Sequence, residues 1–135
     1  MYKNILVPIA PDHNANTSRA LDIAKRLRAE GGQITLLTVV EQIPAYVSQY
    51  LPEGQLDTNL SEAEASLAAD ASGIAGVKTV AISGHAGTTI TEHAEKAEVD
   101  LIVIASHRPG LQDYFLGSTA ARVVRHAPCA VHVVR

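Results

Sequence analysis

Residues Leu101 to His126 read LIVIASHRPGLQDYFLGSTAARVVRH, and this stretch decides the fold that we expect. It opens with an apolar, β-branched run, Leu101–Ile104, which is typical of a strand buried on both faces. A loop follows, and a helix then begins at Gly117-Ser118-Thr119 and ends before Pro128. Its apolar residues recur with helical spacing and predict one buried stripe of Ala120, Val123, Val124 and Ala127.

The start of this helix suits an anionic ligand. The first turn has free backbone N–H groups, and the helix dipole places partial positive charge there. Gly117 would let a ligand approach the backbone, and Ser118 and Thr119 offer hydroxyl groups. His107 and Arg108, at the other end of the loop, would supply positive charge. The purely structural alternative, in which Ser118 only caps the helix, fits the pattern equally well.

These residues resemble the carboxyl-terminal signature of the universal stress protein family, the UspA superfamily. Ala105-Ser106-His107 stands where Gly-Ser-His is usual after the fourth strand, and Gly117-Ser118 stands where the last Gly-Ser is usual. The ending RVVRHAPCAVHVVR also matches. Ala105 replaces a family glycine, and a second glycine is absent or replaced by Arg108. The strings ASHRP and YFLGS resemble the short, single-domain F/G-type branch, some members of which bind ATP.

The composition describes a globular chain. The 135 residues are 47% hydrophobic and 19% charged, which suits a single domain over residues 1–135 with a buried core. The net charge of −3 argues against a nucleic-acid partner. No apolar stretch has membrane-spanning length, and the N-terminus lacks the layout of a signal peptide. With a single cysteine, Cys129, these features predict a cytoplasmic protein without membrane contact.

The first 40 residues predict a βαβ unit. A strand over Tyr2–Ile9 precedes a helix that begins at Thr17 or Ser18, runs to about Arg28 and ends at Gly31-Gly32. The second strand is Gln33–Val40. Strands connected in this way lie parallel, and the crossover is right-handed.

The rest of the chain continues the alternation of helices and strands. A helix over residues 60–73, capped by Asn59 or Ser61, precedes a strand over Val77–Ser83. The next helix begins at Thr88 or Thr89, where Thr89 and Glu92 have capping-box spacing, and carries His93 on its buried side. The last strand is Ala130–Val134. We expect an α/β fold of three layers, α/β/α. The resemblance implies a five-stranded parallel sheet of order 3-2-1-4-5, Rossmann-like and similar to adenine nucleotide alpha hydrolases.

The segment between the second strand and the next helix has mixed character. Pro44, Pro52 and Gly54 interrupt it. Four apolar residues share one face of a short helix: Tyr46, Val47, Tyr50 and Leu51. We favour local packing over the sheet edge, and the alternative is a surface for a partner or a lid over a ligand.

Parallel sheets bind ligands beyond the carboxyl ends of their strands. That rule brings the first strand's end beside the loop that follows Ile104 and beside the end of the second strand. The resemblance implies that the backbone of strands one and two holds adenine, that Ala105 and Gly117 lie near the ribose, and that the Gly117–Thr119 amides hold the phosphates. The family's aspartate position is Ala10 here, and Asp12 is either its replacement or a turn residue. The candidate binding residues are Pro8, Ile9, Ala10, Asp12, Val39, Val40, Ala105, Ser106, His107, Arg108, Gly117, Ser118 and Thr119.

The sequence contains no P-loop, no Rossmann glycine motif, no zinc-ligand cluster and no serine-nucleophile motif. We therefore expect no catalytic residue, no metal site built from side chains and at most a slow ATPase. The leading hypothesis is a stress-response module that binds ATP, AMP or ADP, with Mg²⁺ held through the phosphates and water. The alternative is a dimeric interaction protein without nucleotide. An enzyme of a related α/β nucleotide fold ranks last, because the chain leaves no second domain for a substrate. The resemblance implies a homodimer through Ala130–Val134, with a tetramer as an extension.

Overall fold

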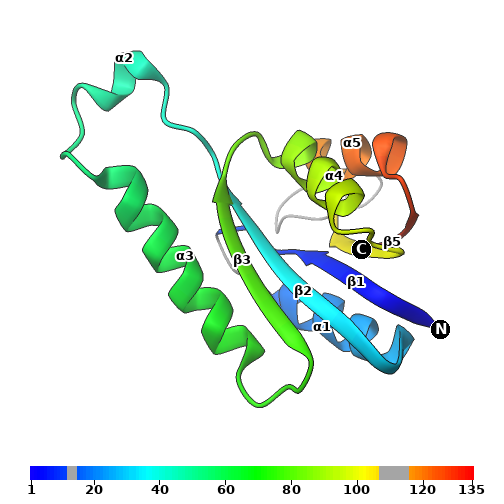
Figure 1. Cartoon of the computed structure of the whole chain (residues 1–135). Helices are drawn as coiled ribbons and strands as arrows, with labels where there is room; N and C mark the ends of the chain where they lie inside the picture. Colours follow the sequence, from blue (N-terminus) through cyan, green and yellow to red (C-terminus); the bar gives the residue numbers. More distant parts are fainter. Residues whose placement is uncertain (12–14, 107–115) are drawn as a thin grey trace.

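A parallel sheet forms the middle of the molecule. The computed structural model describes residues 1–11, 15–106 and 116–135. The strands are β1 (Tyr2–Pro8), β2 (Arg28–Val40), β3 (Val77–Ser83), β4 (Leu101–Ala105) and β5 (Ala130–Val134). They form one five-stranded sheet of order β3-β2-β1-β4-β5, and every neighbouring pair is parallel (Figure 1). The predicted fold class and strand order are confirmed.

Helices cover both faces of this sheet. They are α1 (Ala15–Leu27), α2 (Ala45–Ser48), α3 (Gln55–Ala71), α4 (Ala86–Lys96) and α5 (Ser118–His126). On one face, α1 and α3 pack against a core that includes Ala24 and Leu67. On the other face, α4 and α5 pack against a second core that includes Ile90 and Val123 (Figure 1). The central parts of β1, β2 and β4 are buried on both faces, which explains their continuous apolar runs.

The first crossover differs from the prediction. α1 ends at Leu27, and β2 already begins at Arg28 rather than at Gln33, so Gly31-Gly32 does not end a helix. The early part of β2 pairs irregularly with β1, because the register shifts between Tyr2 and Asn4. Gly31 lies in this irregular part with a φ of 77°, a conformation that glycine adopts without steric cost. An extended backbone therefore replaces the predicted helix end.

The predicted starts of three helices are wrong. α1 begins at Ala15, so neither Thr17 nor Ser18 precedes it as a cap. α3 begins at Gln55, after Gly54 with a φ of 81°, so Asn59 and Ser61 lie inside the helix. Gly54 has a left-handed backbone conformation and precedes α3 without a side-chain cap hydrogen bond.

The start of α4 is also earlier than expected. The helix begins at Ala86, and its N-cap residue His85 makes no side-chain cap hydrogen bond. Thr89 therefore lies within the helix, and the capping box with Glu92 does not form. The cap comes instead from a side chain that is distant in the sequence, as described below.

Two predicted buried positions lie closer to the solvent. Ala120 and Val123 are buried as expected, but Val124 is 46% exposed. Consecutive helix residues point about 100° apart, and in α5 Val123 faces the sheet while Val124 lies at the solvent-exposed edge of the stripe. His93 is half-buried rather than a core residue.

The segment around α2 does not pack on the sheet edge, so the packing prediction is wrong. Tyr46 is 73% exposed, Tyr50 is 81% exposed and Leu51 is 37% exposed. Figure 1 shows α2 away from the sheet, beyond the start of α3. α2 has only four residues between Pro44 and Gln49, which is too short to bury an apolar face. Within the described ranges, no helix is both long and apolar enough to span a membrane.

Candidate functional site

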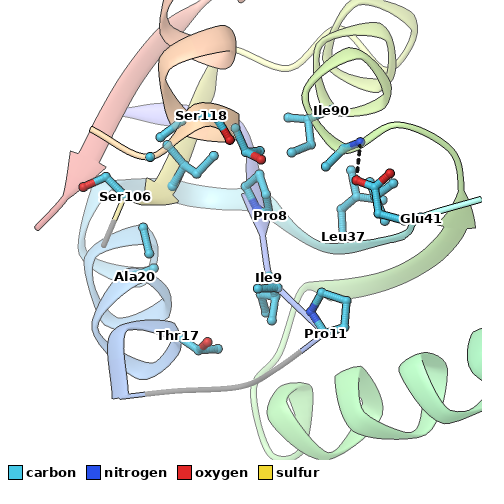
Figure 2. Close-up of a pocket in the computed structure, with 18 residues that line it drawn as sticks. Pro8, Ile9, Pro11, Thr17, Ala20, Leu37, Glu41, Ile90, Ser106 and Ser118 are labelled. Atoms are coloured by element: carbon cyan, nitrogen blue, oxygen red, sulfur yellow. Dashed lines mark hydrogen bonds between the residues drawn. The ribbon is translucent and has the colours of Figure 1, made fainter. Parts of the chain in front are cut away.

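A cavity of about 500 Å³ opens at the carboxyl edge of the sheet. It lies between the ends of β1, β2 and β4 and the starts of α1, α4 and α5 (Figure 2). Nine of the candidate residues line it: Pro8, Ile9, Ala10, Val39, Ala105, Ser106, Gly117, Ser118 and Thr119. Residues from four separate parts of the sequence therefore meet at one cavity, where the rule for parallel sheets places ligands.

The end of β1 is tied to β2 through the backbone of Ile9. The Ile9 N–H donates to the Leu37 carbonyl over 2.8 Å, and the Thr38 hydroxyl donates to the Ile9 carbonyl over 3.0 Å. Thr38 is only 1% exposed, so this hydroxyl is part of the core rather than of the cavity wall. Both polar groups of the Ile9 backbone are thus engaged inside the protein, and Ala10 is the first exposed residue beyond β1.

Val40 is the one described candidate residue that does not line the cavity. Its carbonyl accepts a hydrogen bond of 3.0 Å from the Gly84 N–H, which ties the end of β2 to the loop before α4. Gly84 is buried, and a Cβ atom there would collide with the Thr89 hydroxyl. The end of β2 therefore contributes Val39 to the cavity, while Val40 fixes the neighbouring loop.

Ser106 joins the ends of β4 and β5 to the start of α5. Its N–H donates to the Val134 carbonyl over 3.0 Å, and its hydroxyl lies 3.4 Å from the same oxygen. Its carbonyl accepts from the Gly117 N–H over 3.2 Å. A Cβ atom on Gly117 would lie 2.9 Å from that carbonyl oxygen. Glycine is therefore required here for the close approach of two backbone segments, independently of any ligand.

The start of α5 faces the cavity without a capping side chain. Gly117 is the N-cap residue and makes no side-chain cap hydrogen bond, so the alternative in which Ser118 caps the helix is wrong. In the part of the chain that the structure describes, the Ser118, Thr119 and Ala120 amides have no hydrogen-bond partner. These N–H groups and the helix dipole make this end of the cavity suitable for an anion.

The start of α4 is covered by Glu41, which the sequence analysis missed. The Glu41 Oε1 atom accepts a hydrogen bond of 3.2 Å from the Ala86 N–H (Figure 2). Among the described lining residues, Glu41 alone has a titratable side chain. It follows Val40 directly, so the rule that selected Ala10 after β1 would have selected Glu41 after β2.

Apolar side chains form the floor of the cavity. They include Leu37, Ile90 and Ile104, which were not among the candidate residues predicted from the sequence. Leu37 and Ile104 come from the two strands that flank β1, and Ile90 comes from the buried face of α4. Such a floor suits a flat apolar ring system.

Three candidate residues, Asp12, His107 and Arg108, lie outside the described residues. Within the described ranges, no group of three or more His, Cys, Asp or Glu side chains is arranged to hold a metal ion.

Two described side chains, His93 and Cys129, have a shifted pKa, and neither belongs to the described cavity lining. Burial lowers the pKa of His93 on α4. Burial, and then the charge of Asp100, raise the pKa of the Cys129 thiol, as expected for an unreactive cysteine.

The sequence and the fold have counterparts among known proteins. The family model named Universal stress protein family matches residues 1–135. The chain belongs to the universal stress protein family. It is 35% identical to the universal stress protein A homolog 2 of Coxiella burnetii, over 99% of this chain and 95% of the relative. It is 31% identical to a universal stress protein of Thermus aquaticus, over the full length of both chains.

Solved structures of the family share the fold. The universal stress protein UspA from Lactobacillus plantarum superposes with a TM-score of 0.78 at 29% identity, over 99% of this chain and 98% of that one. A universal stress protein in complex with cAMP gives 0.66 at 21% identity, over 99% and 97%. The Arabidopsis thaliana family protein with AMP bound gives 0.64 at 19% identity, over 98% and 90%. At these lower identities the likeness concerns the fold.

Proposed function

We propose that this universal stress protein binds an adenine nucleotide in the cavity, with ATP, AMP and ADP as the candidate ligands. The observation that carries the proposal is the start of α5, which faces the cavity with no side-chain cap from the described residues. The cavity volume of about 500 Å³ lies within the range of about 300–1,000 Å³ that is common for small-molecule sites. Two family structures, one with cAMP and one with AMP, add support from the same fold.

In this proposal the two ends of the nucleotide meet different surroundings. The phosphates accept hydrogen bonds from the Ser118 and Thr119 amides, where the helix dipole favours negative charge. The purine lies on the apolar floor beside Val39 and Ile90. The ribose lies between them, near Ala105. Asp12, His107 and Arg108 stay candidates for further contacts.

Magnesium would enter with the phosphates rather than before them. The described lining residues include one carboxylate, Glu41, which already accepts a hydrogen bond from the Ala86 amide. Mg²⁺ is commonly held by phosphate oxygens and water with one or two carboxylates, which suits such a site. We assign no general base among the described lining residues, and we expect hydrolysis to be slow if it occurs at all. Function would come from a nucleotide-dependent change in an assembly or a partner surface.

We also propose a homodimer through β5, which can associate further into a tetramer. β5 is an edge strand, because β4 is its only neighbour in the described sheet. Its residues Ala130 and His132 are exposed. An edge strand is protected when it pairs with a second copy, and a twofold axis makes that pairing symmetric. Native mass spectrometry at micromolar concentration should give a dimer, and a pure monomer would contradict this proposal.

Nucleotide binding is tested on protein purified without added nucleotide. After denaturation, the supernatant is separated by chromatography and analysed by mass spectrometry. We expect ATP, ADP or AMP to be released in a fixed ratio to protein. The emptied protein should then show a higher melting temperature with ATP or AMP than with buffer or inorganic phosphate.

The second candidate function is a dimeric interaction protein that has lost nucleotide binding. Ala10 and Ala105 favour it, because they stand where family members that bind ATP carry an aspartate and a glycine. Protein that releases no nucleotide and shows no thermal shift with ATP or AMP would support this function and exclude nucleotide binding at the cavity.

A further inference from the structure

Glu41 has a fixed position at the cavity. The register of β2 and β3 pairs Val40 with Ser83, and the Val40 carbonyl accepts from the Gly84 N–H. These contacts place the residue after β2 beside the start of α4. The Glu41 carboxylate then accepts the hydrogen bond from the Ala86 amide. α4 has no acidic residue in its own first turn and no side-chain cap at His85, so Glu41 supplies the negative charge at this helix end.

This contact makes the cavity electrostatically asymmetric. At the start of α5, amide donors without a side-chain cap favour an anion. At the start of α4, the Glu41 carboxylate has replaced the positive helix end by a negative group. In Figure 2, Ser118 and Glu41 lie on opposite sides of the cavity, with Pro8 between them. A ligand with one anionic end is therefore expected to bind in one orientation.

The surroundings of Glu41 indicate which part of the ligand it meets. Glu41 shares the cavity lining with the floor residues Leu37 and Ile90, and it contacts Ala86, the first residue of the helix that carries Ile90. A flat base on this floor presents its edge to the carboxylate. An ionised carboxylate only accepts hydrogen bonds, so it favours an edge that donates one and disfavours an edge that only accepts.

We propose that Glu41 is a specificity-determining residue, which selects a nucleotide whose base donates an exocyclic amine hydrogen bond at the α4 end of the cavity. The inference rests on the proposed function. The hydrogen bond to Ala86 holds the carboxylate in place before the ligand arrives, which reduces the entropy lost on binding. Glu41 is exposed, so the carboxylate discriminates less strongly than a buried one would.

The test compares AMP with purine riboside 5′-monophosphate, which lacks the 6-amino group and is otherwise isosteric. Isothermal titration calorimetry on the full chain should give about tenfold tighter binding for AMP, as expected for one hydrogen bond to a charged acceptor. In Glu41→Gln the side-chain oxygen can still accept from the Ala86 N–H, but the charge is lost and an NH₂ group is added. The ratio of the two dissociation constants should fall to about one.

The matched control is Glu92→Gln. Glu92 is an exposed residue of the same helix, outside the described cavity lining, and this substitution makes the same change in net charge. It should keep the ratio of about ten. The preference of the unmodified chain should also weaken between low and high salt, since ions screen an exposed charge.

The outcomes separate this inference from the proposed function. A ratio near one in the unmodified chain, with AMP bound, would overturn the role of Glu41 and leave nucleotide binding intact. An unchanged ratio in Glu41→Gln would do the same and would reduce Glu41 to a helix cap. If neither nucleotide binds, the proposed function fails, and the inference fails with it.

Discussion

The helices α4 and α5 both begin at the cavity, on the same face of the sheet, yet their first turns differ in charge. Each is held by a buried core residue, Ile90 on α4 and Val123 on α5. At α4 the Glu41 carboxylate accepts the Ala86 amide hydrogen bond. At α5 the N-cap is Gly117, and among the described residues no side chain makes a cap hydrogen bond to the first turn. One helix end is neutralised, and the other remains available to an anion.

This contrast between α4 and α5 indicates that the position of a helix start does not by itself define an anion site. What matters is whether the protein has already satisfied the N–H groups of the first turn. The two ends together give a ligand a direction across the cavity.

Gly117→Asp should abolish measurable AMP binding, with an affinity loss of at least about 100-fold. It adds a negative charge where the phosphates meet the α5 amides. It also adds a Cβ atom 2.9 Å from the Ser106 carbonyl oxygen. The control is Gly117→Ala, which adds the same Cβ atom without a charge. Calorimetry with AMP measures the affinities of both variants, and urea unfolding measures their stability.

Both Gly117 variants should lose about 1–3 kcal/mol of unfolding free energy, because the Ser106 backbone must move. Only the aspartate variant should lose binding almost completely. Equal affinity losses in the two variants would mean that the local backbone, rather than charge, matters at α5. Unchanged affinity in Gly117→Asp would remove the anion site from α5 altogether.

Val123→Ala tests the attachment of α5 to the sheet. Val123 is 0% exposed, and its truncation should cost about 2 kcal/mol of unfolding free energy through lost burial and a residual cavity. The adjacent Val124 is 46% exposed, so Val124→Ala should change stability by less than about 0.5 kcal/mol. Urea denaturation monitored by circular dichroism compares the two. Similar losses would contradict the observed orientation of α5.

The sequence predicted the strands better than the helix starts. β3 and β5 have the predicted bounds, because short β-branched runs between turn residues mark strands clearly. The strand order came from the resemblance to a family rather than from periodicity. The start of α4 was missed because its cap, Glu41, lies 45 residues away from Ala86 in the sequence. A local sequence pattern can predict only a capping residue that lies next to the helix in the sequence.

The sequence predicted those lining residues of the cavity whose place follows from the topology of the backbone. Ala10, Ala105 and Ser118 follow from the rule that ligands bind at the carboxyl ends of parallel strands. Val39 lines the cavity and Val40 does not, because adjacent strand residues point to opposite faces of the sheet. The exposed tyrosines near α2 show the same limit, since helical spacing predicts a shared face but not a surface to cover it.

Glu41→Ala should weaken the start of α4 while α5 stays intact. The loss of the hydrogen bond to Ala86 should cost about 0.5–1 kcal/mol of unfolding free energy. Glu41→Gln keeps an acceptor and should cost about half as much or less. Thermal unfolding of both variants gives the order, with the exposed Glu92→Ala as a surface reference. A stability of Glu41→Ala equal to that of the unmodified chain would show that the carboxylate does not stabilise α4.

The smallest effect concerns the other end of α4. His93 lies in the last turn, and burial lowers its pKa below the ordinary value of 6.5. Because its folded pKa is lower, the unfolded chain binds the proton more readily, so this histidine makes stability rise with pH. Its unfavourable effect is absent above pH 6.5 and grows as the pH falls toward the folded pKa. The protein should therefore be slightly less stable at pH 5.5 than at pH 7.5.

His93→Gln isolates this contribution, because glutamine does not titrate in that range. The difference between the two proteins, measured by urea unfolding across the same pH range, cancels the other titrating groups. The unmodified chain should lose more stability than His93→Gln as the pH falls. A helix dipole that dominated at this carboxyl-terminal turn would instead favour the protonated histidine and raise its pKa. A larger loss in His93→Gln would therefore mean that the dipole outweighs burial at this end of α4.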